Sequence, residues 1–167
     1  MTRQRRLSLL LIAALLAAPL ASAEPVAIGR YKNWSVFTDT AGGEKICYAA
    51  TPATDKAPKT ADHGEVWFYV TNWKSGRAHN QPSLKVGFPL REDMAPKAQI
   101  GRSSWNLFAV DREAFADDAD DPRIVAGLKK GSELRVQAVS ARNTQVAYHF
   151  SLSGSAAAID KAAATCR

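Results

Sequence analysis

Two cysteines, Cys47 and Cys166, are the residues whose types and spacing point most directly to covalent chemistry in this chain. In an oxidising compartment an even number of cysteines favours a disulfide, and two cysteines allow a single pairing within the chain. The bond would close a loop of 118 residues, 48–165, which is worth about 5 kcal/mol in the chain-entropy model. An intermolecular bridge and two free thiols are the alternatives. Thiol–disulfide exchange is not expected, because the chain has no Cys-x-x-Cys motif.

Histidines and an acidic run are the residues to consider for a metal site. His63, His79 and His149 have no partner at metal-ligand spacing, so we expect all three to be solvated. The acidic residues of 117–121 offer carboxylate oxygens to a hard cation, but the run lacks the glycine and terminal glutamate of a calcium-binding loop. Its simpler role is a solvated loop that ends in a helix N-cap at Asp121. We therefore expect no metal site and no cofactor.

Nucleophilic catalysis has little support in the motifs. The chain has no Gly-x-Ser-x-Gly turn, and the pair Ser103-Ser104 has no histidine near it in sequence. Gly42-Gly43 fits a hairpin turn better than a phosphate-binding loop. A triad assembled in space remains open, because sequence separation does not limit one. We expect a protein that is not an enzyme, with an envelope hydrolase as a minor alternative.

Four tryptophans are the candidates for a binding surface, because exposed aromatic side chains often contact sugars or proteins. Trp34 and Trp67 follow the inward period of their segments, which predicts core packing. Trp73 ends its segment beside Lys74 and Arg77, and Trp105 follows a Ser-Ser turn. These two are the candidates for partner binding.

The elements that position these residues are mainly short strands. Alternation of apolar and polar residues predicts strands over 31–38, 45–50, 65–73, 83–88, 99–102 and 105–111, and a hairpin over 134–138 and 146–152. Segment 65–73 (EVWFYVTNW) is apolar at both parities, which predicts a central strand covered on both faces. Residues 24–30 are expected to be a leader into the domain, 51–64 an exposed loop and 112–116 a helical turn.

Two short helices are expected near the C-terminus. Asp121 as N-cap, Pro122 as first residue and Gly131 as a left-handed C-cap bound the first helix. Ser155 is expected to cap the second, which runs over the alanine-rich stretch 156–165. Together the elements predict a single, mainly β domain, an antiparallel β-sandwich or barrel-like fold with two short helices.

The first 23 residues have the pattern of a secretory signal peptide. Arg3, Arg5 and Arg6 precede an apolar run over 7–20, and residues 21–23 (ASA) form a small-x-small cleavage site. We therefore expect a mature domain over residues 24–167, in the periplasm or secreted to the outer envelope. No later segment is apolar for long enough to cross a bilayer as a helix.

The charge of the chain depends strongly on that segment. The full chain has 22 basic and 16 acidic residues, a balance of +6, whereas 19 basic and 16 acidic residues follow Ala23, a balance of +3. No dense basic cluster with interleaved aromatic residues is present, so nucleic-acid binding is not expected.

Three motifs resemble those of the invasion-associated locus B family of Gram-negative bacteria. Residues 31–36 (YKNWSV) resemble the family's opening motif, 45–50 (KICYAA) its cysteine-bearing strand, and 150–154 (FSLSG) its closing motif before an alanine-rich helix. Together with 80–83 (NQPS), the resemblance extends over the mature chain. The chain departs from the family where many members have a cysteine, at Phe37-Thr38, and where they have an aromatic residue, at Ser155.

The resemblance implies a periplasmic or surface-associated protein, linked in some pathogens to host-cell entry, and implies no catalytic residues. We therefore expect a non-enzymatic binding protein. Its partner would be an envelope or host protein, or a polysaccharide. A structural or stress-related envelope factor without a dedicated partner is the alternative.

Overall fold

The computed structural model describes residues 24–167, so the expected signal peptide lies outside the described residues. Within these residues nine strands precede the first helix, two more strands follow it, and the second helix comes last. The strands are β1 (Val26–Tyr31), β2 (Trp34–Ala41), β3 (Glu44–Pro52), β4 (Asp55–Ala57), β5 (Trp67–Trp73), β6 (Gln81–Lys85), β7 (Lys97–Ile100), β8 (Ser103–Val110), β9 (Glu113–Ala116), β10 (Glu133–Val139) and β11 (Gln145–Ser151), and the helices are α1 (Asp121–Lys130) and α2 (Ser155–Thr165).

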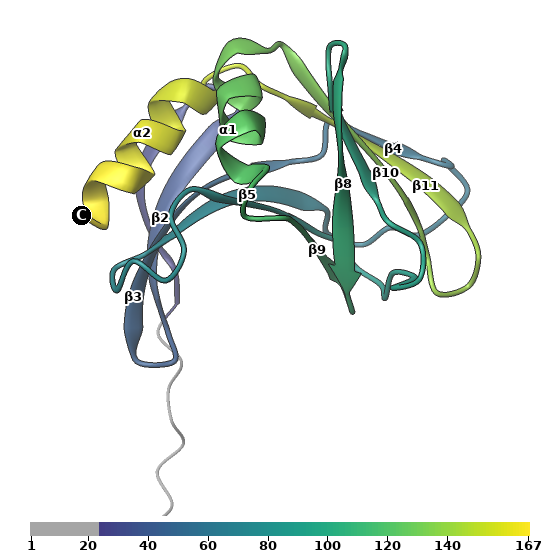
Figure 1. The fold of residues 1–167 in the computed structure, drawn as a ribbon, viewed down its shortest axis with the longest axis horizontal. Helices are drawn as coiled ribbons and strands as arrows, with labels where there is room; N and C mark the ends of the chain where they lie inside the picture. The colour runs from purple at the N-terminus through teal and green to yellow at the C-terminus, as the bar shows by residue number, and fades with distance from the viewer. Residues whose placement is uncertain (1–23) are drawn as a thin grey trace, which may run out of the picture.

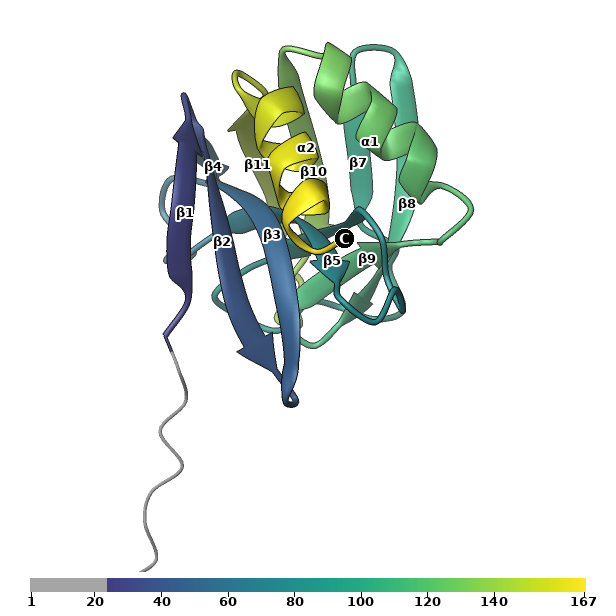
Figure 2. The ribbon, with the colours of Figure 1, turned by 90° about the vertical axis from the view of Figure 1, so that its left-hand side faces the viewer.

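The strands form a single antiparallel sheet in the order β1-β2-β3-β5-β6-β9-β8-β7-β10-β11-β4. The sheet curls on itself without closing, so that its inner face surrounds one core (Figure 1). Both helices lie on the same side of this curled sheet and pack against each other (Figure 2). The predicted mainly β, single-domain fold with two helices is confirmed, in the form of an open, barrel-like sheet.

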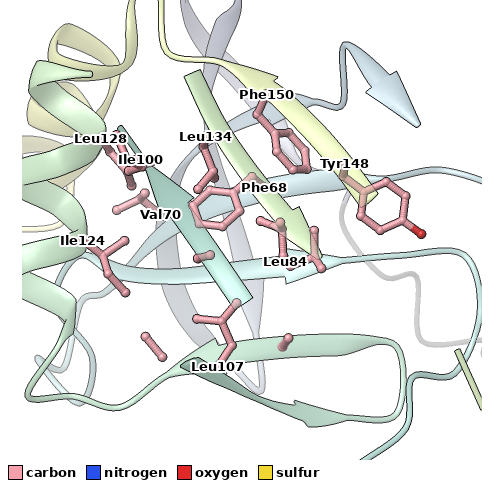
Figure 3. Close-up of a cluster of buried hydrophobic side chains, with 14 of the residues drawn as sticks. Phe68, Val70, Leu84, Ile100, Leu107, Ile124, Leu128, Leu134, Tyr148 and Phe150 are labelled. Atoms are coloured by element: carbon pink, nitrogen blue, oxygen red, sulfur yellow. The ribbon is translucent and has the colours of Figure 1, made fainter. Parts of the chain in front are cut away.

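The core forms because every second residue of each strand points inward. Phe68 and Val70 of β5, Leu84 of β6 and Phe150 of β11 meet there, all at most 1 % exposed (Figure 3). Strands from both ends of the sheet order contribute to this one cluster, so the core joins the two halves of the sheet. Helix α1 adds an apolar stripe to the cluster, formed by Ile124, Val125 and Leu128.

The two helices are where the sequence predicts them, but their ends differ from the expectation. Helix α1 is capped by Asp120, with Asp121 as its first residue, and Gly131 has extended backbone (φ −78°, ψ 175°) rather than left-handed. Helix α2 is capped by Gly154, in the left-handed conformation at φ 96°. Ser155 is instead a buried helical residue, and its hydroxyl lies 2.7 Å from the Leu128 carbonyl oxygen. The serine therefore ties α2 to α1.

Three stretches expected to be irregular or helical form strands. Residues 26–31 pair with β2 as β1, 55–57 pair with β11 as β4, and 113–116 pair with β6 and β8 as β9. Each is short and adds to the edge or the interior of an existing sheet. The sequence of β4 (DKA) has little strand propensity, so its pairing with β11 fixes it, whereas β1 (VAIGRY) contains three residues that favour strands.

A disulfide joins Cys47 of β3 to Cys166 at the end of α2, with the Cα atoms 5.7 Å apart. The predicted intrachain pairing is confirmed. Because Cys47 is an inward-facing residue, the bond holds α2 against the inner face of β2, β3 and β5. Among the described residues no helix is long and apolar enough to cross a membrane.

Candidate binding site

Six aromatic side chains that contact one another in two groups lie on the outer side of the sheet, opposite the face that the helices cover, and Trp73 shares this side at the end of β5. They alternate with the inward residues of β2, β3, β5, β8 and β9. We call this surface the outer aromatic face, and it consists of Phe37, Tyr48, Trp67, Tyr69, Phe108 and Phe115. In Figure 1 it is the side of β2, β3 and β5 that faces away from α1 and α2.

Strand register brings these rings into contact in two groups. Phe37 and Tyr48 are direct cross-strand partners and stack at 5.3 Å between centroids. Tyr69 then meets Tyr48 edge-on at 5.6 Å and Trp67 at 6.5 Å. Phe108 and Phe115, also direct partners, lie 5.9 Å apart. The contacts therefore include both stacked and edge-to-face pairs, the two arrangements that aromatic side chains prefer.

Exposure distinguishes this surface from the rest of the sheet. Phe108 and Val110 are each 52 % exposed, and the other aromatic residues of the face are half-buried. The outward residues of β7, β10 and β11 are instead mostly polar, and include Lys97, Gln99, Arg135, Gln137 and His149. A polar outer face is what a water-exposed antiparallel sheet normally presents. The aromatic half of the sheet is therefore the unusual one.

Acidic side chains border the outer aromatic face. Glu65 accepts a hydrogen bond from the Trp67 indole at 2.8 Å, and Glu113 lies 3.9 Å from Lys85. Burial raises the pKa of Tyr69 to about 12, with smaller contributions from nearby groups including Glu113 and Glu65. Burial likewise raises the pKa of Tyr48, assisted by the charge of Asp39. Both tyrosines are neutral at physiological pH and offer their hydroxyls as hydrogen-bond donors.

The two tryptophans predicted for partner binding lie on opposite faces of the sheet. Trp73 is on the outer face at the end of β5, where the Arg77 guanidinium lies 3.3 Å from its ring centroid. Trp105 has the inward parity of β8 and packs against the core and α1. The structure does not bring these two residues together. Of the predicted core pair, Trp34 is fully buried as expected, whereas Trp67 is on the outer face and the prediction for it is wrong.

The predicted coverage of β5 on both faces is also wrong. Phe68, Val70 and Asn72 are buried, but Trp67, Tyr69, Thr71 and Trp73 are only half-buried. Aromatic residues at both parities of one strand admit two interpretations, a covered second face or a partly exposed one. The strands that flank it carry a signal that decides between them, since Tyr48 and Phe37 alternate with inward residues and would extend the same face.

The histidines do not form a site. His63 is buried, against the prediction, with Nδ1 3.2 Å from the Tyr148 hydroxyl and Nε2 2.9 Å from the Pro58 carbonyl oxygen. His79 is exposed, and His149 pairs with Glu133 at 3.0 Å. Within residues 24–167 no three His, Cys, Asp or Glu side chains are grouped so that they could hold a metal ion.

The acidic run at the start of α1 is partly buried rather than fully solvated. Asp121 is only 8 % exposed, and its Oδ1 has no hydrogen-bond partner within residues 24–167. Burial and, to a smaller extent, the neighbouring carboxylates raise its pKa to about 7. This carboxyl therefore keeps its proton to a higher pH than an ordinary aspartate does.

A family model for the invasion-associated locus B proteins matches residues 34–163 of the chain. The chain belongs to the invasion-associated locus B family. No curated protein and no solved structure gave a significant match. The family resemblance seen in the sequence is thus confirmed over most of the described domain.

The opening and closing motifs of the family resemblance meet at one place in the structure. The indole N–H of Trp34 donates to the Ser151 carbonyl oxygen at 2.9 Å, and the backbone N–H of Asn33 donates to the Ser153 carbonyl oxygen at 3.2 Å. A Cβ atom on Gly154 would lie 1.9 Å from the Tyr31 carbonyl oxygen. The opening and closing motifs therefore clamp β1 and β2 to the start of α2. The residues of these two motifs build the fold, whereas the cysteine-bearing motif also contributes Tyr48 to the outer aromatic face.

Proposed function

We propose that this invasion-associated locus B protein is a non-enzymatic binding protein of the periplasm or outer envelope, which holds a protein partner on its outer aromatic face. The single observation that carries the proposal is the contrast between the two halves of one sheet. Both halves bury an apolar inner face, but only one exposes aromatic side chains on its outer face. Exposed apolar patches mark sites of association, and here two such groups of rings flank the outward Ser83 of β6.

The geometry of the rings favours a protein over a polysaccharide as the partner. Sugars bind aromatic side chains through the flat faces of the rings. Here Phe37 and Tyr48 cover each other's faces, and Arg77 covers that of Trp73. The surface that these covered rings leave is apolar, with tyrosine hydroxyls as donors, which suits aliphatic and aromatic side chains of a second protein.

The border of the face indicates the charge of the partner. Asp39, Glu65 and Glu113 lie around the aromatic residues, Lys85 pairs with Glu113, and Arg77 lies over Trp73 at the end of β5. An apolar patch bordered by Lys and Arg would complement this arrangement.

The test is a comparison of two surface variants in capture from an envelope extract. Phe108→Ser with Val110→Ser removes two exposed apolar residues of the face, and Met94→Ser is a matched control because Met94 is 43 % exposed but lies outside it. We expect the wild type and the Met94 variant to retain the same captured protein and the double variant to lose it. Equal capture by all three proteins would contradict the proposal.

The salt dependence of capture provides a second readout. Because acidic residues border the face, we expect binding to weaken as the ionic strength rises and the Debye length becomes shorter. Binding that strengthens with salt would show that the acidic border plays no part in recognition.

A further inference from the structure

A surface hollow of about 520 Å³ lies between helix α1 and the hairpin of β7 and β8, away from the outer aromatic face. Its lining comes from both elements. The residues are Ile100, Ser103, Ser104, Trp105, Arg123, Ala126, Gly127 and Lys130. The hollow contains Trp105, one of the two tryptophans predicted for partner binding.

The helix side of the hollow follows from the sequence of α1. Arg123, Ala126, Gly127 and Lys130 are spaced i, i+3, i+4 and i+7, so they share one face of the helix. Two long cationic side chains thus stand at the ends of the face with two small residues between them. Lys129 points elsewhere, because its Nζ pairs with Asp160 of α2 at 2.6 Å. The small residues make the depression and the cations border it.

The opposite wall is apolar and closely fitted to the helix. A Cβ atom on Gly127 would lie 3.2 Å from Ile100 Cδ1 and 3.3 Å from Trp105 Cη2, so the glycine lets α1 approach the indole ring. The indole N–H of Trp105 donates to no acceptor within residues 24–167, whereas those of Trp34 and Trp67 donate to Ser151 and Glu65. The wall therefore offers an apolar ring surface together with a free donor.

The polar groups that line the hollow either carry a positive charge or can donate hydrogen bonds. Its lining contains two cations and two serine hydroxyls but no carboxylate. Asp120 contacts one guanidinium nitrogen of Arg123 from outside the lining, and the remaining guanidinium N–H groups are left for a ligand. Such a site complements a ligand that is rich in acceptors and negatively charged.

We propose that this hollow binds a sugar residue that carries a phosphate or carboxylate group. The anionic group lies between Arg123 and Lys130, the sugar ring packs on the indole of Trp105, and ring hydroxyls hydrogen-bond to Ser103 and Ser104. Trp105, predicted from the sequence as a partner-binding residue, then acts here and not on the outer aromatic face. The inference is independent of the proposed protein partner.

The experiment is a titration of the folded protein, residues 24–167, with glucose 6-phosphate, followed by NMR of the tryptophan indole N–H signals. Replacement Trp105→Phe assigns the Trp105 signal. We expect a saturable shift of that signal with glucose 6-phosphate, and a weaker response to glucose or to inorganic phosphate alone. The absence of a saturable shift, or equal binding of inorganic phosphate, would overturn the proposal.

Two double variants with the same change in net charge separate specific binding from general attraction. Arg123→Gln with Lys130→Gln removes the cations of the hollow, and Lys97→Gln with Arg142→Gln removes two exposed cations that do not line it. We expect the first pair to weaken binding by about tenfold and the second to leave it unchanged. An equal loss in both pairs would show that net charge alone is responsible.

A third variant tests the shape of the hollow without removing a cation. Ala126 is exposed, so Ala126→Glu should fold normally while placing bulk and negative charge between Arg123 and Lys130. We expect it to abolish the shift of the Trp105 signal. Undiminished binding by a folded Ala126→Glu protein would exclude the hollow as the site.

Discussion

Removal of the disulfide between Cys47 and Cys166 is the perturbation whose size follows most directly from the structure. The two residues are 119 apart in sequence, so the bond closes nearly the whole domain into one loop. In the chain-entropy model a loop of this length lowers the entropy of the unfolded chain by about 16 cal/mol/K, which is worth about 5 kcal/mol at 25 °C. This is a large part of the 5–15 kcal/mol by which a typical domain is stable.

The variant Cys47→Ala with Cys166→Ala is suited to the measurement, because both side chains are buried and alanine adds no unpaired polar group. We expect urea unfolding, followed by tryptophan fluorescence, to show a loss of about 4–5 kcal/mol. The slope m should rise, since an unfolded chain without the cross-link exposes more surface. Chemical reduction of the wild type should give a similar loss.

A loss below about 1 kcal/mol with unchanged m would refute this reasoning, because the model ties stability to the length of the closed loop. A different pattern would arise if α2 detached alone. Hydrogen exchange would then show protection lost in α2 but retained in β10 and β11, and the bond would be stabilising one helix rather than the domain.

Three further predictions concern the clamp, the buried acid and the tyrosines. Gly154→Ala should destabilise the protein by about 3 kcal/mol or more in urea unfolding, because the added Cβ meets the Tyr31 carbonyl oxygen and the backbone there is left-handed. The control is Gly76→Ala, which is also left-handed but has open space around it and should cost about 1 kcal/mol. Asp121 has a pKa raised to about 7 from 3.8, so the folded state keeps a proton that the unfolded state loses, and stability should fall as pH rises between those two values. Asp121→Asn should remove about 1–2 kcal/mol of that fall, measured by thermal melts between pH 3.8 and about 7. An unchanged pH profile would contradict this prediction. Spectrophotometric titration should show Tyr69 ionising near its raised pKa of about 12, and Tyr69→Phe should remove that step; a titration in which every tyrosine ionises near 10 would be inconsistent with the burial of this residue.

Much of the fold was predictable because a strand with one buried face shows a regular alternation of apolar and polar residues. The hairpin of β10 and β11 is the clearest case, since Leu134 and Val136 face Phe150 and Tyr148 across seven paired positions. The stretches that were missed have no such pattern. Strand β4 contains only Asp55, Lys56 and Ala57, and it exists because β11 offers it an edge to pair with.

The binding surface was less predictable, for a related reason. Alternation predicts that two faces differ but does not say which face of an aromatic strand is inward. The period of its segment predicts Trp67 in the core, but the segment is apolar at both parities, and the exposed fraction of each face depends on what packs above it. Helix α2 covers the inner face through the Cys47–Cys166 bond, and no described element covers the other. The hollow at α1 had a clearer signal, in the i, i+3, i+4, i+7 spacing of Arg123, Ala126, Gly127 and Lys130.

The position of β5 in the middle of the sheet has a consequence for misfolding. Its seven residues, WFYVTNW, have no charge and no proline, and they combine strong strand propensity with aromatic side chains. Such a segment is typical of those that assemble into amyloid when their backbone groups are unpaired. In the native fold β3 and β6 pair with both of its edges. The chain is therefore prone to aggregate while it folds, until β3 and β6 have paired with β5. A chaperone that binds this segment would protect the protein during that interval.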